Sequence, residues 1–250
     1  MKLALQIYSL RQYLDQAHIT DTLKKTKAMG YDGVEWPGLM GYTPAALAEI
    51  TRNAGLAFFS VHINMADILT CDTGLLDEMA QAGAKYLPIG WLPEERLAGG
   101  ALFDDTCEQI RAYSAEAAKR GMLVLYHNHD FDLAPCAGTT KLDCLYTALP
   151  KNVLGAEPDT CWLYSGGVDP ADYLRRYSSR APIIHLKDCV AAGGRSGYKP
   201  VGSGVLDWDG ILAVCGNADW VCVEQDEPSD GMDAFECVSR SAAFLRTRLG

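Results

Sequence analysis

Residues 43–64 read TPAALAEITRNAGLAFFSVHIN and contain one complete helix-to-strand unit. Thr43 can cap a helix, and Pro44 suits its first position because the φ angle of proline is already helical and its missing N–H would have no partner there. Gly55 follows the last helical residue and accepts the left-handed conformation that ends a helix. The apolar run from Ala57 then predicts a buried strand. This stretch therefore predicts a helix that passes directly into a strand.

The same unit recurs along the whole chain. Glycine stands between a helical pattern and an apolar run at three further places, Gly30, Gly83 and Gly121. We expect eight strands, beginning near Lys2, Gly33, Ala57, Lys85, Met122, Val153, Pro182 and Trp220. We expect eight helices, over Thr20–Met29, Thr43–Ala54, Leu75–Ala82, Asp104–Arg120, Lys141–Leu149, Pro170–Tyr177, Trp208–Cys215 and Met232–Arg248.

Unbroken alternation of strands and helices predicts parallel strands joined by right-handed crossovers. Eight units in 250 residues fit a single closed (β/α)8 barrel, the TIM barrel. No linker interrupts the pattern, so we predict one barrel domain over residues 1–250. A doubly wound open sheet is the alternative, but it requires a glycine-rich phosphate loop after the first strand, where this chain has Tyr8-Ser9-Leu10-Arg11.

The charge balance limits the partners. The chain has 32 acidic and 22 basic residues, a net charge of -10 and 48% hydrophobic residues. A negative average field repels nucleic acid and anionic lipid, and no apolar run is long enough to cross a membrane. The composition therefore favours a small-molecule ligand, with no nucleic acid and no membrane as partner. It leaves the oligomeric state open.

The cysteines and the start of the chain bear on the compartment. Nine cysteines lie in apolar contexts without a C-x-x-C pair, so we expect reduced thiols rather than a disulfide framework. The run Met1–Leu5 is similar to the start of a short signal peptide, but Gln6 and Arg11 interrupt its apolar character. We therefore expect a cytoplasmic protein.

Polar side chains collect at the expected carboxyl ends of the strands, where the active sites of (β/α)8 barrels are built. The segments are Ser60–Asn64, Tyr126–Asp130, Glu157–Thr160, His185–Asp188 and Glu224–Glu227. Because side chains alternate along a strand, three pairs share a side: His127 with His129, Glu157 with Asp159, and His185 with Lys187. Converging imidazoles and carboxylates suit manganese, zinc, cobalt or iron better than calcium. The sequence therefore predicts a divalent metal at the mouth of the barrel.

Six segments in a characteristic order and spacing carry a resemblance to a known family. They are Gly33–Trp36, Tyr126–Phe131, Asp159–Trp162, His185–Asp188, Pro200–Trp208 and Val223–Asp226. Together they resemble the sugar phosphate isomerase/epimerase group of xylose isomerase-like TIM barrels, which includes inosose dehydratases and is akin to endonuclease IV. The resemblance spans nearly the whole chain.

The resemblance implies a metal held by residues of strands five to eight, and it places Asp159, His185 and Glu224 among the ligands. Many relatives have Glu-Asn-His at strand five, where this chain has His127-Asn128-His129. His127 therefore replaces a residue that is often both ligand and base. We expect one divalent ion, Mn²⁺ before Zn²⁺, Co²⁺, Fe²⁺ or Mg²⁺, bound by His127, Asp159, His185 and Glu224.

The implied activity is that of a metal-dependent isomerase or epimerase of a sugar or sugar phosphate. Glu224 would remove a proton next to a carbonyl, Lys187 would help to stabilise the enediolate, and His127 would act as ligand, acid or base near neutral pH. Because His127 replaces a carboxylate, β-elimination by a lyase or dehydratase on a keto-sugar, keto-glycoside or inosose is an alternative. A non-catalytic sugar-binding barrel is a further hypothesis. DNA repair of the endonuclease IV type is disfavoured by the acidic charge.

Four more residues are predicted to bind substrate: His62, His129, Trp36 and Trp162. An indole can pack against the C–H face of a sugar, although ordinary barrel packing explains the two tryptophans equally well. For His62 a structural role is also an alternative.

Two other features have competing interpretations. An internal ion pair with Glu157 or Asp159 is the alternative role for Lys187. Gly202-Ser203-Gly204 fits a turn before a helix better than a phosphate cradle, and Arg195 and Lys199 beside it do not decide the matter.

Overall fold

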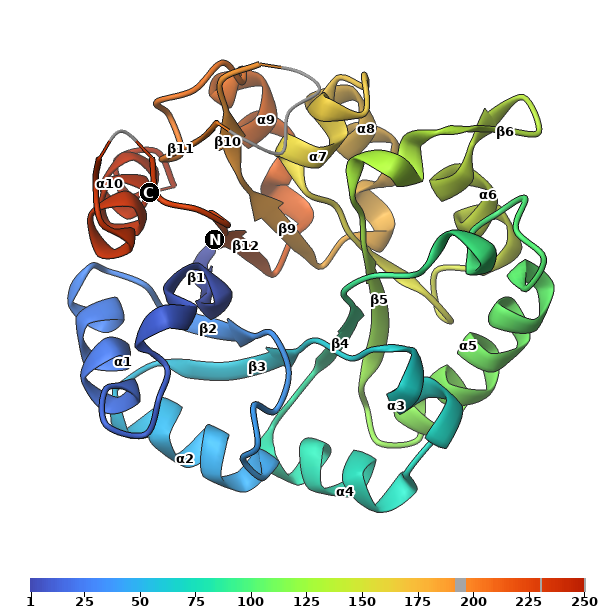
Figure 1. Ribbon diagram of the computed structural model, residues 1–250, viewed down its shortest axis with the longest axis horizontal. Coiled ribbons are helices and arrows are strands. Elements are labelled where there is room, and N and C mark those ends of the chain that lie inside the picture. The colour runs from blue at the N-terminus through green and yellow to red at the C-terminus, as the bar shows by residue number, and fades with distance from the viewer. Residues whose placement is uncertain (192–196, 230, 250) are drawn as a thin grey trace.

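The computed structural model describes residues 1–191, 197–229 and 231–249, and over these ranges eight parallel strands form a barrel (Figure 1). The strands lie in the order β8–β5–β4–β3–β2–β1–β12–β9. Their bounds are β1 (Lys2–Gln6), β2 (Gly33–Trp36), β3 (Ala57–Val61), β4 (Tyr86–Ile89), β5 (Leu123–His127), β8 (Gly155–Glu157), β9 (Ile183–Leu186) and β12 (Trp220–Val223). A parallel bridge between Asp159 and His185 links the two ends of this order. The predicted (β/α)8 barrel is confirmed.

Within the same ranges, eight helices surround the strands (Figure 1). They are α1 (Ile19–Ala28), α2 (Pro44–Asn53), α4 (Thr73–Ala82), α5 (Phe103–Ala118), α6 (Lys141–Ala148), α8 (Pro170–Tyr177), α9 (Trp208–Val214) and α10 (Ala234–Arg246). Each overlaps a helix expected from the sequence. No helix in the described part of the chain is long and apolar enough to cross a membrane.

The loops at the carboxyl ends of the strands contain short elements that the sequence pattern did not predict. Two are the helices α3 (Met65–Thr70) and α7 (Thr160–Ser165), which Asn64 and Asp159 cap with their side chains. Others are the hairpins of β6 (Pro135–Cys136) with β7 (Thr139–Thr140) and of β10 (Asp188–Cys189) with β11 (Tyr198–Lys199). The 3₁₀ turns η1 (Ile7–Tyr13), η2 (Glu94–Arg96) and η3 (Asp130–Leu133) also follow strands, whereas η4 (Ser178–Arg180) and η5 (Cys215–Asn217) follow the helices α8 and α9 at the other end of the barrel.

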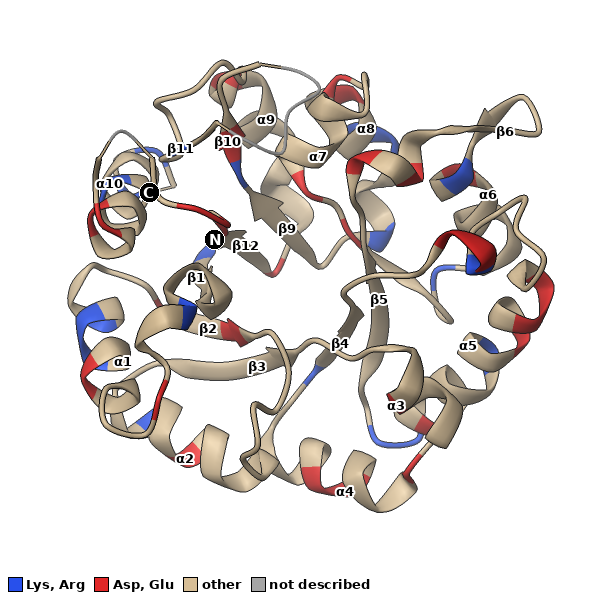
Figure 2. Ribbon diagram, in the orientation of Figure 1, with Lys and Arg blue, Asp and Glu red and all other residues tan. Residues whose placement is uncertain are grey.

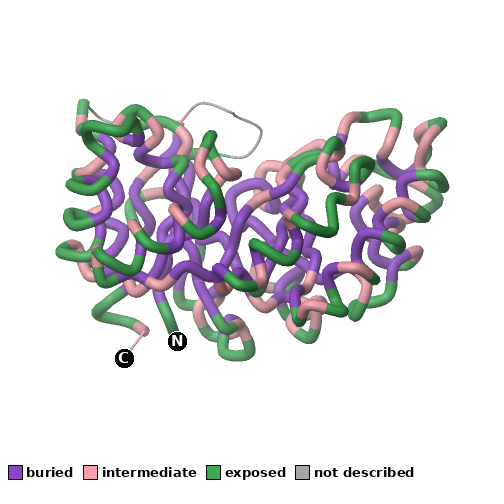
Figure 3. Tube along the Cα trace, turned by 90° about the horizontal axis from the view of Figure 1, so that it is seen from below, coloured by how far each residue is buried: buried purple, intermediate pink, exposed green. Residues whose placement is uncertain are grey.

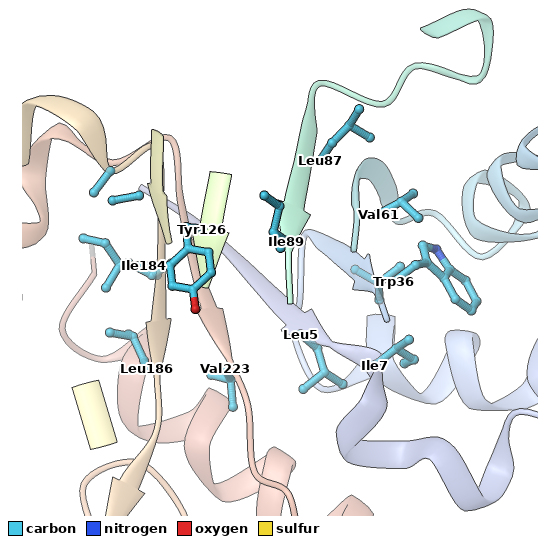
Figure 4. Packing of buried hydrophobic residues seen from close by; sticks show 14 of the residues in the cluster. Leu5, Ile7, Trp36, Val61, Leu87, Ile89, Tyr126, Ile184, Leu186 and Val223 are labelled. Atoms are coloured by element: carbon cyan, nitrogen blue, oxygen red, sulfur yellow. The ribbon is translucent and has the colours of Figure 1, made fainter. Parts of the chain in front are cut away.

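Apolar side chains occupy both faces of the barrel wall. Those on the outer face, such as Leu5, Leu87 and Val223, pack in the large cluster shared with the helices (Figure 4). Those inside form a separate cluster of Ala4, Phe59, Tyr86, Leu125, Ile183, Trp220 and Cys222. The tube view shows the buried wall and places both termini at one end of the molecule (Figure 3). The inner cluster fills the barrel near the amino ends of the strands, so polar residues are confined to the other end.

The glycine helix ends have the expected backbone. Gly30, Gly55, Gly83 and Gly121 all have positive φ, between 74° and 99°. Only glycine adopts this region without a steric penalty from Cβ. Each therefore allows the chain to turn sharply from helix into strand.

We predict that Gly55→Ala lowers the free energy of unfolding by about 1–2 kcal/mol, because φ at this residue is +78°. Gly216→Ala is the matched control, since Gly216 lies in η5 without positive φ and with no atom near the added Cβ. Its free energy of unfolding should stay the same or rise by up to about 1 kcal/mol. Urea unfolding of the wild type and the two variants measures these free energies. An equal loss in both variants would contradict the left-handed helix end assigned to Gly55.

Candidate functional site

Above the inner apolar cluster, the inward positions of the strands become polar. Gln6 on β1, Glu35 on β2 and His185 on β9 end their strands with buried polar side chains. In Figure 2, acidic segments at the end of β2 and after β12 lie toward the centre of the ring. Buried charge is costly unless it is paired or bound to a cation. This end of the barrel therefore holds a concentration of charge that needs compensation.

The structure brings together the four residues predicted as metal ligands. Potential ligand atoms of His127, Asp159, His185 and Glu224 all lie within 4.8 Å of one another, and all four residues are buried. His185 Nδ1 lies 3.2 Å from Glu224 Oε2. We call this set the Glu224 cluster. Two carboxylates and two imidazoles at this spacing could hold one divalent metal.

Two atoms of the Glu224 cluster lack a hydrogen-bond partner among the described residues. They are His127 Nδ1 and Asp159 Oδ2. The first lies 3.2 Å from Glu157 Oε1 without hydrogen-bond geometry, and the second lies 3.6 Å from Lys187 Nζ. Asp159 Oδ1, in contrast, accepts from the Trp162 N–H at 2.9 Å. Buried unpartnered acceptors are unfavourable, and a cation contacting them would remove that cost, so the residues present fit a metal.

A second group of ionisable residues lies against the first. Potential ligand atoms of Glu35, His62, Glu157 and His185 also lie within 4.8 Å of one another. His185 Nε2 lies 2.7 Å from Glu35 Oε1 and 3.1 Å from Glu157 Oε1. His62 Nε2 lies 3.1 Å from each of the same two oxygens. We call this set the Glu35 cluster, and His185 belongs to both clusters through its two ring nitrogens.

The clusters shift the pKa values of their members. Burial alone would lower the pKa of His62, but the carboxylates of Glu35 and Glu157 outweigh it and raise this pKa to about 10. Burial alone would raise the pKa of Glu224, but the charge of Lys187 and the contact with His185 hold it well below its usual range. Burial raises the pKa of Asp159 despite the nearby Lys187 ammonium. Glu224 therefore stays ionised at neutral pH.

Lys187 is a buried cation among carboxylates. Its Nζ lies 3.0 Å from Glu224 Oε2 and 3.6 Å from Asp159 Oδ2, and it donates to Asp226 Oδ2 at 2.9 Å. Burial opposes its charge, but these three carboxylates raise its pKa well above the usual value. The predicted ion pair with Asp159 is thus present, within a wider network. Lys187 is charged and suited to donating a hydrogen bond, not to accepting a proton.

A cavity of about 620 Å³ opens over the Glu224 cluster. His62, His129 and Trp162, three of the predicted substrate-binding residues, line it together with Glu224 and His127. The Trp162 ring lies 5.3 Å from the His129 ring and 5.0 Å from Lys187 Nζ. The remaining lining residues are Gln6, Tyr8, Arg11, Pro37, Gly90, Trp91, Phe131, Lys187, Tyr198, Asp226 and Glu227.

The fold and the site can be compared with known proteins. The family model of the xylose isomerase-like TIM barrel matches residues 23–248. The chain belongs to this family. A sugar phosphate isomerase/epimerase from Parabacteroides distasonis ATCC 8503 has a TM-score of 0.84 and 22% identity, covering 98% of this chain and 97% of that chain. The IOLI protein, solved with a bound zinc atom, has a TM-score of 0.73 and 16% identity, covering 99% and 97%.

The curated relatives found by sequence match a smaller share of this chain than the solved structures do. An inosose dehydratase from Bacillus thuringiensis (strain Al Hakam) is 23% identical over 153 residues, which are 54% of this chain and 50% of that protein. An inosose dehydratase from Bacillus cereus (strain AH820) is 23% identical over 167 residues, 59% and 55% of the two chains. The chain thus spans about half the length of the curated relatives it matches. The solved structures establish the shared fold.

The prediction that Trp36 binds substrate is wrong. Its side chain is fully buried and its Nε1 donates to Thr51 Oγ1 of α2 at 3.2 Å. Figure 4 shows it in the outer layer, near Ile7 and Val61. Side chains alternate along a strand, so the inward position of Glu35 turns its neighbour outward. Trp36 therefore joins β2 to α2 and does not contact a sugar in the cavity.

The glycine loop after β11 has the structural role that was favoured from the sequence. The N–H groups of Gly202 and Gly204 donate to Asp188 Oδ2 at 3.0 and 2.9 Å, and Trp208 Nε1 donates to the same oxygen at 2.7 Å. Asp207 caps α9 by accepting from the Gly210 N–H. A carboxylate of the chain thus occupies the position an external phosphate would need. Arg195 lies outside the described residues.

Sequence reasoning missed several residues of the site. Glu35 and Gln6 carried a usable signal, because each is a polar residue at an inward position of an otherwise apolar strand. Asp226 lies just after a predicted strand end, but no sequence pattern paired its carboxylate with the Lys187 ammonium. Tyr8 and Trp91 carried no signal, because their places in the cavity wall depend on loops far apart in the chain.

We predict that the protein purified without chelator contains bound divalent metal, and that an Asp159→Asn, Glu224→Gln double variant loses most of it. Both substitutions remove a carboxylate from the Glu224 cluster while preserving side-chain shape. Elemental analysis by mass spectrometry measures the metal per chain. Asp143→Asn is the matched control, because Asp143 is buried and hydrogen-bonded to Thr139 and Tyr173 away from the site. Equal metal content in the double variant and the wild type would refute the ligand assignment.

Proposed function

We propose that this protein is a divalent-metal-dependent sugar isomerase or epimerase that acts through an enediolate, by removing a proton next to a carbonyl. The observation that carries the proposal is the Glu224 cluster, which combines a fitting ligand set with an ionised carboxylate and a charged lysine at the wall of a cavity. His127, Asp159, His185 and Glu224 would hold the metal, with Mn²⁺ as the first choice and zinc supported by its presence in the IOLI protein. When bound, the metal would supply a Lewis acid that polarises the substrate carbonyl.

The side chains around the cavity have complementary roles in this proposal. Glu224 is ionised and reaches the cavity wall, so it can accept the proton from carbon. Lys187 Nζ lies 3.0 Å from Glu224 Oε2, so it can donate to a substrate oxygen next to the carbon that loses the proton. His127 is buried at the wall and can return a proton. A well-placed acid or base contributes roughly 10² to 10⁴ in rate.

Three further residues would orient the sugar. His62 and His129 line the cavity, where they can bind hydroxyl groups. Trp162 lies beside Lys187 and can pack against a C–H face of the ring. Holding the reacting carbon in place makes the proton transfer effectively intramolecular.

A lyase or dehydratase is the second candidate function. His127 supports it, because an imidazole at this position can protonate a departing oxygen, whereas the residue it replaces in many relatives is a carboxylate. The matched inosose dehydratases support it too, at 23% identity over about half their length. In that reaction the same proton is removed, and the electron pair left on carbon expels an oxygen from the next carbon.

We expect solvent deuterium to enter a ketose at the carbon next to its carbonyl when the metal-loaded protein is incubated with candidate ketoses in D₂O. Glu224→Gln should slow this exchange by at least about 10² to 10⁴, because it removes the proton acceptor and also one of the proposed metal ligands. NMR and mass spectrometry of the sugar measure the exchange, with Asp143→Asn as control at wild-type rate.

The products separate the hypotheses. Deuterium in a sugar of otherwise unchanged formula means isomerisation or epimerisation, and an unsaturated ketone means elimination. Sugar binding without exchange or elimination, whichever metal is supplied, would contradict both proposals and leave a sugar-binding barrel.

A further inference from the structure

A second compartment of about 300 Å³ adjoins the reaction cavity. The two share Pro37 after β2, His62 after β3, and Gly90 and Trp91 after β4. They therefore adjoin along the loops of three neighbouring strands, with these shared residues at the boundary between them. Together they exceed what a single hexose requires, because cavities of roughly 300–1,000 Å³ already suit ligands with far more atoms than one sugar ring.

Gly90 lies at the boundary between the two compartments. A Cβ at this position would lie 2.9 Å from His62 Nδ1. The Gly90 N–H donates to the Ile63 carbonyl at 3.2 Å, so the backbone is held against the strand beside it. Any larger residue would press on His62 at this boundary.

Trp91 forms an aromatic wall shared by both compartments. It is 55% exposed, so much of its indole is open to solvent. Leu39 and Met79 line the second compartment with it. A flat apolar face open to solvent is the kind of surface on which the C–H face of a sugar ring packs, while the hydroxyls point elsewhere.

Polar atoms suited to hydroxyl groups lie in the same compartment. Asn64 Oδ1 accepts from the Ala66 N–H at 2.7 Å, and Asp67 Oδ2 accepts from the Asn64 N–H at 2.8 Å. Asn64 Nδ2 and Asp67 Oδ1 have no hydrogen bond within the described residues, and both side chains line the compartment. The compartment thus offers one donor and one acceptor beside an aromatic face, as a hydroxylated ring requires.

The charges disfavour a phosphorylated ligand. The described lining of the second compartment contains Asp67 and no Lys or Arg, and its imidazole, His62, is already paired with Glu35 and Glu157. In the reaction cavity, Lys187 is already surrounded by three carboxylates, and Arg11 Nη2 lies 2.5 Å from Glu227 Oε1. An incoming phosphate would therefore meet cations that are already paired and carboxylates that repel it.

We infer that the substrate is an uncharged two-ring glycoside, with the reacting sugar over the Glu224 cluster and a second sugar ring against Trp91. The placement of the reacting ring rests on the proposed function, whereas the site for the second ring goes beyond it. Trp91 would set specificity for the second ring without contacting the reacting atoms.

The test is binding of defined probes to the protein as purified, measured by calorimetry. The probes are D-glucose, three glucobioses with different β-linkages (sophorose, laminaribiose and cellobiose), D-glucose 6-phosphate and 4-nitrophenyl β-D-glucoside. At least one glucobiose should bind about tenfold more tightly than glucose. Glucose 6-phosphate should bind no more tightly than glucose.

Variants locate the second ring. Trp91→Ala should remove the about tenfold gain of the best glucobiose and weaken glucose binding by a clearly smaller factor, because Trp91 also lines the reaction cavity. Trp91→Phe should retain most of the gain. Leu69→Ala is the control, because Leu69 is exposed on α3 and lines neither compartment. It should bind every probe as the wild type does.

Four outcomes would overturn the inference. They are no glucobiose binding more tightly than glucose, glucose 6-phosphate binding best, Trp91→Ala weakening glucose and glucobiose equally, and the aryl glucoside exceeding every glucobiose. Deuterium exchange tests the proposed function separately. If the protein prefers a glucobiose but catalyses neither exchange nor elimination, the proposed reaction is refuted and the binding site for the second ring is retained.

Discussion

The imidazole of His185 lies between buried carboxylates of both clusters. Its Nδ1 lies 3.2 Å from Glu224 Oε2, and its Nε2 lies 2.7 Å from Glu35 Oε1. Its backbone N–H donates to the Pro158 carbonyl. A parallel bridge between His185 and Asp159 joins β9 to the end of β8, where the barrel closes. Closure of the barrel and assembly of the site therefore depend on the same residue. A barrel that failed to close between β8 and β9 would separate Asp159 from His185.

The charge of this buried layer explains why a cation suits it. Glu35, Glu157, Asp159 and Glu224 lie at the carboxyl end of the barrel with little or no solvent exposure. Lys187 and the imidazole of His62, whose pKa the carboxylates raise to about 10, compensate part of this charge. Taking several carboxylates out of water is favourable only where positive charge is supplied close by. The same excess of carboxylates makes the cavity a poor place for a phosphate and a good one for a neutral, oxygen-rich ligand.

The inner apolar cluster and the polar layer occupy opposite ends of the barrel interior. Stacked Phe59 and Trp220, with ring centroids 4.0 Å apart, are part of the cluster that fills the barrel beneath the site. This filling keeps water from entering from below and holds the strand ends at fixed separations. The loops above the strands lie outside this packed cluster. In this chain they supply Trp91, Tyr198 and the second compartment.

The sequence alone determined the order of strands and helices, because caps, glycine ends and apolar periodicity depend on neighbouring residues. It also indicated that His127, Asp159, His185 and Glu224 belong to one end of the barrel, because parallel strands present their carboxyl ends together. Only the tertiary structure decided which side chains point inward. The β2–β3 pairing shifts register between Val34 and Glu35, and Glu35 enters the site while Trp36 packs against α2. The sharing of His185 by two clusters and the exposure of Trp91 depend on residues far apart in the chain. Distances between distant strands and loops follow from barrel closure and packing, which no local pattern of residues records.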